Sequence, residues 1–407
     1  MGTQGSKDEW QQPAEGQMSG WGRWEKPPTP YDRFMEEEGI PTFRGIGVRQ
    51  LQDLPLRPWK RLGGRGTFLQ LDGTESRWGM YVVEVPARGA LNPEQHLYEE
   101  VIFVVEGRGT TEVWQEDESR KQVFEWNKGS LFAIPLNTHH RIVNATSEPA
   151  LLLVGTTAPS MINLIQDNNF IFHCDYAFTS RYDASNEYFK PDETLRPEPV
   201  KGLAMQRTNL VPDIINCELP PDNRRSPGYR RIEHHMAGGT FYMFCGQHET
   251  GRYAKAHRHE PGAVLICIGG KGYTYTWPSE LGTHPWADGK GEQVLRQDYE
   301  HVGMVSAAPV SGNWFHQHFS VGKEPLRVLA FLGPGYKTFA RGGRPGAKQR
   351  DDSALDVNKG GWAIEYRDED PHIRQEFAAM LAKEGVESRM TDEVYEARFE
   401  FTGEKPS

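Results

Sequence analysis

The chain has 407 residues, a formal net charge of -10 and a pI near 5.8. This length exceeds what a single hydrophobic core usually serves, so we expect two domains. An acidic chain lacks the clustered Lys and Arg that hold phosphate backbones, which excludes a nucleic-acid surface and leaves a small molecule as the expected partner.

Residues 1–60 carry no alternating strand pattern and are rich in Trp, Pro and charge, as in GWGRWEKPPTPYDRF at 20–34. Such a segment either stays disordered or buries its aromatic rings on another surface. We therefore expect an N-terminal arm that docks on a barrel or on a second subunit. The chain as a whole is expected to form a homo-oligomer.

An internal repeat relates the two halves of the chain. The segment EQHLYEEVIFVVEGRGTTEVW (94–114) aligns without gaps with HRHEPGAVLICIGGKGYTYTW (257–277). The aligned pairs are Glu94 and His257, His96 and His259, Glu100 and Ala263, Gly107 and Gly270, Gly109 and Gly272, Thr111 and Thr274, and Trp114 and Trp277. Further along, His140 aligns with His316 in the same order. A repeat of this kind indicates a duplicated domain.

Both copies of the repeat have the pattern of β structure. The runs VIFVVEGRGTTEVW (101–114) and VLICIGGKGYTYTW (264–277) are β-branched and aromatic and are broken by Gly-x-Gly, which predicts hairpins. Each copy continues with another apolar run bounded by turn residues, at 150–156 and 326–333. Many short strands joined by Gly and Pro turns predict an all-β sandwich or jelly roll.

The segment DPHIRQEFAAMLAKEG (370–385) predicts a helix over 371–384. Asp370 is a suitable N-cap, Pro371 suits the first helical position, and Gly385 is a C-terminal stop. The apolar stripe of the helix consists of Ile373, Phe377, Met380 and Leu381. We expect this helix to dock on the barrels rather than to take part in catalysis.

Each copy holds most residues of two spaced motifs, G-x5-HxH-x3-E-x6-G and then G-x5-P-x-G-x2-H-x3-N. The C-terminal copy contributes Gly251, His257, His259, Gly270, Gly303, Pro309 and His316, and the N-terminal copy contributes His96, Glu100, Gly107, Gly129, Pro135, His140 and Asn144. Over about 60–340 the chain resembles a bicupin of the cupin superfamily.

This resemblance implies two tandem cupin (jelly-roll) barrels with an N-terminal arm and C-terminal helices. We place the arm at 1–60, the N-terminal barrel at 61–165, the connection at 166–215, the C-terminal barrel at 216–338 and the tail at 339–407.

In cupins the HxH pair, the Glu and the later His converge on one metal ion. The resemblance therefore implies a C-terminal metal site formed by His257, His259 and His316, although an isolated HxH is more often a core or surface pair. The glutamate position holds Ala263. Without a carboxylate ligand the ion keeps its full charge and an open face, which suits an anionic substrate that chelates through two oxygens.

The replacement of Glu by Ala is similar to the three-histidine ring-cleaving dioxygenases that act on gentisate, 1-hydroxy-2-naphthoate or salicylate. By the same likeness, His318 in NWFHQHFS (313–320) is a catalytic candidate that contacts substrate or dioxygen. Its alternatives are a spare metal ligand or a structural histidine. Strand parity places Lys255 and Tyr253 on the face of His257, so Lys255 is a second catalytic candidate, for a substrate carboxylate.

The N-terminal copy departs from the motif at its first histidine, where Glu94 stands. A possible N-terminal site comprises Glu94, His96, Glu100 and His140. Two carboxylates favour a harder ion such as Mn or Mg. The alternative is a decayed site that serves only as scaffold.

We expect a non-haem Fe(II) dioxygenase that cleaves a hydroxylated aromatic acid or similar chelating substrate, with Mn(II), Ni(II) or Zn(II) as alternative ions. The other candidates are a redox-neutral metal enzyme (decarboxylase, isomerase or hydrolase) acting on a small carboxylic acid, and a non-enzymatic ligand-binding bicupin. The first thirty residues lack an apolar signal core, the four cysteines show no CxxC spacing, and no apolar run approaches a membrane span. We therefore expect a cytoplasmic protein without membrane contact.

Overall fold

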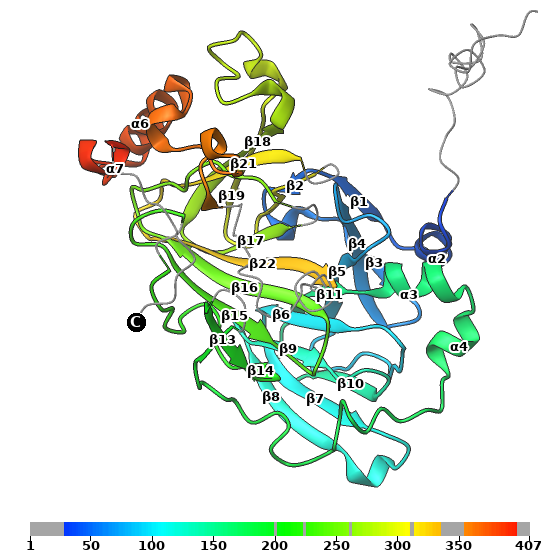
Figure 1. Cartoon of the computed structure of the whole chain (residues 1–407). Coiled ribbons are helices and arrows are strands. Elements are labelled where there is room, and N and C mark those ends of the chain that lie inside the picture. Colours follow the sequence, from blue (N-terminus) through cyan, green and yellow to red (C-terminus); the bar gives the residue numbers. More distant parts are fainter. Residues whose placement is uncertain are drawn as a thin grey trace, which may run out of the picture.

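The computed structural model describes residues 28–198, 202–222, 225–259, 263–309, 313–334 and 354–396. Within these ranges the chain is mostly β, and its strands form two large sheets and two three-stranded sheets (Figure 1). In the same ranges, none of the helices combines the length and the apolar character needed to cross a membrane. Trp21 and Trp24 of the predicted arm lie outside the described residues.

The N-terminal half consists of one large sheet and one small sheet. The order of the large sheet is β1 (Thr42–Gly45), β4 (Gly64–Leu71), β5 (Gly79–Val85), β11 (Ala150–Thr156), β6 (Glu100–Glu106), β9 (Leu131–Ile134) and β14 (Leu210–Val211), with β3 (Arg57–Trp59) on β4. The small sheet has the order β10 (His139–Asn144), β7 (Arg108–Trp114) and β8 (Gln122–Asn127). The Gly-x-Gly turn joins β6 to β7, but the predicted hairpin is not formed, because β6 pairs with β11 and β9 in the large sheet while β7 pairs with β10 and β8 in the small one.

The C-terminal half repeats this plan. The order of its large sheet is β12 (Arg196–Pro197), β13 (Ala204–Arg207), β15 (Arg230–His235), β16 (Phe241–His248), β22 (Leu326–Pro334), β17 (Val264–Gly269), β20 (Met304–Ser306) and β2 (Gly47–Val48). The small sheet has the order β19 (Leu295–Glu300), β18 (Lys271–Pro278) and β21 (Trp314–Ser320).

Each large sheet gains an edge strand from outside its own half. Strand β2, from the predicted arm, pairs antiparallel with β20 of the C-terminal half. Strand β14, from the predicted connection, pairs antiparallel with β9 of the N-terminal half. The described part of the arm also docks on the N-terminal half, where Tyr31 and Phe34 are buried. The two halves are therefore tied together by backbone pairing at both ends.

The duplication inferred from sequence is visible in the backbone. Two isolated bridges occur in the N-terminal half, between Ala90 and Val143 and between Glu94 and His140. The aligned positions in the C-terminal half form the same two bridges, between Tyr253 and Phe319 and between His257 and His316. Each half therefore positions its motif segment against the strand that carries the later histidine.

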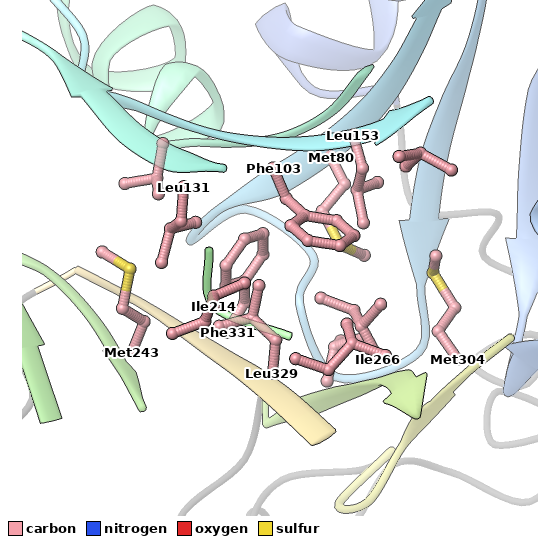
Figure 2. Close-up of a cluster of buried hydrophobic side chains, with 14 of the residues drawn as sticks. Met80, Phe103, Leu131, Leu153, Ile214, Met243, Ile266, Met304, Leu329 and Phe331 are labelled. Atoms are coloured by element: carbon pink, nitrogen blue, oxygen red, sulfur yellow. The ribbon is translucent and has the colours of Figure 1, made fainter. Parts of the chain in front are cut away.

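The two large sheets pack face to face across a continuous apolar core. Figure 2 shows this core, with Met80, Phe103, Leu131 and Leu153 from one sheet meeting Met243, Ile266, Met304, Leu329 and Phe331 from the other. These side chains are fully or almost fully buried. Such a core fixes the orientation of the two motif segments relative to each other.

The interiors of the two halves differ in what fills them. Large side chains such as Phe68, Trp126 and Phe132 fill the N-terminal half. The apolar cluster inside the C-terminal half is mainly of smaller residues, including Ala263, Ala307 and Ala330. The C-terminal interior therefore holds less apolar volume around its histidines.

The helices lie outside the sheets. They are α2 (Pro30–Glu37), α3 (Ala158–Ile165), α4 (Asn168–Phe172), α6 (Pro371–Glu384) and α7 (Asp392–Glu396), with 3-10 turns at Leu51–Asp53, Glu118–Arg120, Ser279–Leu281, Gly291–Gln293, Val357–Lys359 and Tyr366–Asp368. Helix α6 has the predicted bounds, with Asp370 as N-cap and Gly385 in the left-handed conformation at its C-terminus. It lies beside β18 and β21 (Figure 1), where its Phe377 joins a cluster with Tyr273 and Tyr275. These two tyrosines therefore face away from the histidines.

Candidate metal centres

Three histidines converge in the C-terminal half. One ring nitrogen from each of His257, His259 and His316 lies within 4.8 Å of the other two. His316 is on β21, and His257 is held against it because each backbone N–H donates to the other's carbonyl, at 3.0 and 2.8 Å. His257 and His316 are buried, and His259 is partly exposed.

The hydrogen bonds of these rings fix which nitrogen faces the centre. The Nδ1 of His257 lies 3.0 Å from the Lys255 carbonyl, and the Nδ1 of His316 lies 3.4 Å from the Trp314 carbonyl. A carbonyl can only accept, so each Nδ1 carries the proton and each Nε2 presents a lone pair. The two Nε2 atoms are 3.1 Å apart. Two lone pairs at this distance repel unless a cation lies between them.

This separation fits two ligands of one ion. Metal–nitrogen bonds of about 2.0–2.1 Å at roughly right angles place neighbouring ligand nitrogens about 3 Å apart. Burial holds the pKa values of His257 and His316 well below the ordinary value. The positive charge of Arg225 acts in the same direction on both rings. The imidazoles are therefore neutral near pH 7, which is the form that binds a metal. The residues present fit a divalent ion.

His318, predicted as a catalytic candidate, lies next to this group but not in it. Its ring centroid is 5.5 Å from that of His316 and 6.3 Å from that of His257. The Nδ1 of His318 is 2.8 Å from the Thr274 hydroxyl, and that hydroxyl is 2.9 Å from the hydroxyl of Tyr299. Burial keeps the pKa of His318 well below its ordinary value.

Lys255 does not turn toward the histidines as strand parity predicts. It is buried, and its Nζ lies 2.6 Å from Oε2 of Glu365, which follows the second barrel in the chain. The parity argument is wrong for Tyr253 as well, whose hydroxyl donates to Glu369 outside the barrel. The physical reason is that residues 249–259 form isolated bridges rather than a continuous strand, so the two-residue alternation is lost. A role for Lys255 in substrate binding stays a prediction.

A second group lies in the N-terminal half. His96, Glu100 and His140 are all buried, and their ligand atoms lie within 4.8 Å of one another. The Nδ1 of His96 is 2.9 Å from the Tyr98 carbonyl, and the Nδ1 of His140 is 3.3 Å from the Thr138 carbonyl. Both Nε2 atoms are again left as lone pairs. The Nε2 of His96 is buried without a hydrogen-bond partner, at 3.4 Å from Oε2 of Glu100.

The charges at the N-terminal group suit a cation. Burial by itself raises the pKa of Glu100, but the influence of His96, with His140 and the Tyr81 hydroxyl, outweighs it and the net pKa is lowered. The hydroxyl of Tyr81 donates to Oε1 of Glu100 at 2.9 Å. Burial, aided by His96, lowers the pKa of His140 to about 4. The group therefore offers two imidazoles and one carboxylate, a donor set that binds divalent transition metals.

Glu94, predicted among the possible N-terminal ligands, lies outside this group. Its carboxylate forms an ion pair with Arg61, which also binds Glu38 at 2.9 Å. A guanidinium beside a carboxylate is a strong competitor for its oxygens. With Glu94 engaged there, the group holds one carboxylate rather than two, and the argument for a hard ion based on two carboxylates no longer applies.

Sequence reasoning missed His248. This residue ends β16, is buried, and has its ring centroid 6.0 Å from that of His318. Burial lowers its pKa to about 3. His234 is also buried, but both of its ring nitrogens lack hydrogen-bond partners and it belongs to neither group. His248 lies outside both motifs, and strand parity in β16 does not by itself indicate that this side chain lies near the C-terminal histidines.

A comparison with known protein families finds a match within the N-terminal half. Residues 81–155 match the family described as Cupin domain. The matched segment contains His96, Glu100 and His140. No curated protein matches the chain significantly. The narrower resemblance to three-histidine ring-cleaving dioxygenases stays a prediction.

Solved structures similar to this chain include two single-residue variants of oxalate decarboxylase from Bacillus subtilis. The first is 13% identical, with a TM-score of 0.46, and the second is 14% identical, with a TM-score of 0.45. In both cases the match covers 72% of this chain and 78% of the other. Likeness at this level is too low to transfer a substrate or a reaction.

Proposed function

We propose that this protein is a metal-dependent enzyme that binds a small anionic substrate at the C-terminal centre and acts on it by redox-neutral chemistry, such as decarboxylation, isomerisation or hydrolysis. One observation carries the proposal. Three imidazoles converge with the spacing of metal ligands, and within the described part of the chain no carboxylate joins them. The ligand set is therefore neutral.

The charge of the site determines the class of substrate. A divalent ion held by neutral ligands keeps both positive charges, and when bound it supplies Lewis-acid polarisation of a substrate oxygen. Arg225 adds a positive charge that is felt by His257, His316 and His318. A carboxylate or another chelating anion is the ligand that offsets this excess of positive charge.

The protein groups around the centre support acid–base chemistry. His318 is a neutral imidazole that lies beside the ligand set without belonging to it, and His248, also neutral, lies next to His318. Imidazoles in this position can orient a substrate and donate hydrogen bonds to it. Because both are buried, water has little access and their interactions with a substrate are strengthened.

A dioxygenase is the second candidate, and it is favoured by Ala263. This residue occupies the glutamate position of the motif and lies in the apolar cluster inside the C-terminal half. With no side-chain ligand there, coordination positions remain for a chelating substrate and for dioxygen. The two candidates share the site and differ in whether oxygen is consumed.

Oxygen dependence separates the two candidates. Protein purified anaerobically is analysed for bound metal and then incubated with hydroxy, oxo, dicarboxylic and hydroxylated aromatic acids, with and without oxygen. The proposal expects metal-dependent turnover that is unchanged when oxygen is removed. Turnover that requires one dioxygen per substrate overturns it in favour of the dioxygenase. Metal-loaded protein that turns over no acid in either condition contradicts both.

A further inference from the structure

A hydrogen-bonded chain of three side chains leads into the C-terminal centre. Tyr299 on β19, Thr274 on β18 and His318 on β21 come from the three strands of the small sheet, and all three are buried. Thr274 lies directly opposite His318 in the strand register. Its hydroxyl is 2.9 Å from the Tyr299 hydroxyl and 2.8 Å from Nδ1 of His318.

The donors and acceptors of this chain can be assigned by counting. Thr274 is the only hydrogen-bond partner of the Tyr299 hydroxyl in the described part of the structure. If the tyrosine donates to Thr274, then Thr274 donates to Nδ1 of His318 and every group is satisfied. If the hydrogen bonds run the other way, the tyrosine proton is buried without an acceptor, which is unfavourable. The first direction is therefore favoured.

This direction gives His318 the opposite tautomer to the metal ligands. In His257 and His316 a backbone carbonyl keeps the proton on Nδ1, and Nε2 is a lone pair. In His318 the nitrogen Nδ1 accepts from Thr274, so a neutral ring carries its proton on Nε2. No residue in the described ranges bonds to that Nε2, and it is not among the fully buried unsatisfied atoms.

We propose that Tyr299 and Thr274 hold His318 as an Nε2–H donor, which keeps it out of the metal ligand set and directs a hydrogen bond at an oxygen of the bound substrate. This inference rests on the proposed function, because it assigns His318 a role toward the same anionic substrate. Thr274 and Tyr299 are positioning residues that act through His318. A donor fixed before the substrate binds stabilises negative charge on that oxygen without reorganisation.

The tautomer can be measured without any substrate. Zinc-loaded protein labelled with nitrogen-15 in histidine gives long-range proton–nitrogen spectra in which the two tautomers have different patterns. His318→Gln identifies the His318 signals by their loss. We expect the Nε2–H pattern for His318 and the Nδ1–H pattern for His257 and His316. An Nδ1–H pattern for His318 in the native protein overturns the proposal.

Variants of Thr274 and Tyr299 test the direction of the hydrogen bonds that lead to His318. Thr274→Val removes the hydroxyl at nearly constant shape and Tyr299→Phe removes the terminal donor, so both are expected to shift His318 away from the Nε2–H form. Thr274→Ser keeps the hydroxyl and should restore it. Thr276→Val is the matched control, because Thr276 is on the same strand but bonds to the Ala307 carbonyl at 2.8 Å. A native His318 pattern in both Thr274→Val and Tyr299→Phe contradicts the proposal.

Turnover gives a second readout once a substrate is known. Thr274→Val should lower kcat/KM by about 10–100-fold while the metal content stays at the native level, as is typical for partners that orient groups around a metal. Thr274→Ser should restore most of the loss. If no carboxylic acid is turned over, the proposed function fails while the tautomer measurement still stands, so the two failures can be told apart.

Discussion

Glu94 and His257 occupy the same backbone position in the two halves of the chain, yet only His257 joins a metal-binding group. Each residue is bridged to the later histidine of its own half, His140 or His316. The difference arises in the side chain, because the Glu94 carboxylate pairs with Arg61 while the His257 imidazole faces His316. The two centres therefore have different donor sets on similar backbones.

Replacing His257 or His316 by Ala should remove the C-terminal ion and lower turnover by at least about 100-fold, because the ion supplies several kcal/mol of charge stabilisation. Metal content is measured by elemental analysis on the same preparation used for activity. His301→Ala is the control, since His301 is half exposed and belongs to neither group. Native metal content in both ligand variants would show that the ligand assignment is wrong.

Replacing His96 by Ala should remove one ion per chain and leave the C-terminal ion in place. Turnover should change by less than about 10-fold, because the two groups lie in different halves and share no ligand. Glu94→Gln should retain both ions, since its carboxylate pairs with Arg61. Loss of the N-terminal ion in folded Glu94→Gln protein would restore Glu94 to the ligand set.

Introducing a carboxylate at Ala263 tests the open face of the C-terminal centre. Ala263→Glu places an acid at the motif's ligand position, where it offsets one charge of the ion and competes with an anionic substrate. The ion should stay bound, and turnover should fall by about 100-fold or more. Ala263→Gln is the matched control for size. Undiminished turnover in metal-loaded Ala263→Glu would show that the three-histidine face is not the basis of function.

The buried pair of Lys255 and Glu365 should be structural. Lys255→Met leaves the Glu365 carboxylate buried without its partner, so the free energy of unfolding should fall by about 3–5 kcal/mol. The double variant Lys255→Met with Glu365→Leu should recover most of this loss. Urea unfolding of the two variants gives the comparison. A Lys255→Met variant that keeps native stability but loses substrate affinity would instead support the predicted substrate role.

Acid should destabilise the protein through its buried histidines. Burial, with His235 adding in the same direction, lowers the pKa of His234 to about 3, so between this value and the ordinary value of 6.5 the unfolded chain binds more protons. Stability is therefore lost as the pH falls below about 6.5. His234 contributes about 2 kcal/mol of this loss at pH 5. The ring lies in a site without hydrogen-bond partners, so an apolar side chain can replace it.

His234→Leu should reduce the difference between urea midpoints at pH 7 and pH 5, while His301→Gln leaves that difference unchanged. The other buried histidines remain in both variants, so their contribution cancels in the comparison. A native pH dependence in His234→Leu would mean that His234 is not the buried neutral group described here.

The sequence was sufficient for the features that depend on local pattern and residue type. The repeat predicted two similar halves, because residues at aligned positions have equivalent backbone partners. Glu94 is bridged to His140, and the aligned His257 is bridged to His316. Helix α6 was predictable to its bounds, because its cap, first-turn proline and C-terminal glycine all lie within the segment. The convergence of His257, His259 and His316 was predictable, because few side chains bind metals and their motif spacing is specific.

Only the tertiary structure decided which of these side chains act together. Glu94 finds Arg61 and Lys255 finds Glu365, so neither turns to the centre where its spacing would place it. His248 and Tyr299 reach the C-terminal interior from strands outside both motifs. The physical reason is that a buried polar group takes the best partner within about 3 Å, and that partner is chosen by packing between segments far apart in the chain.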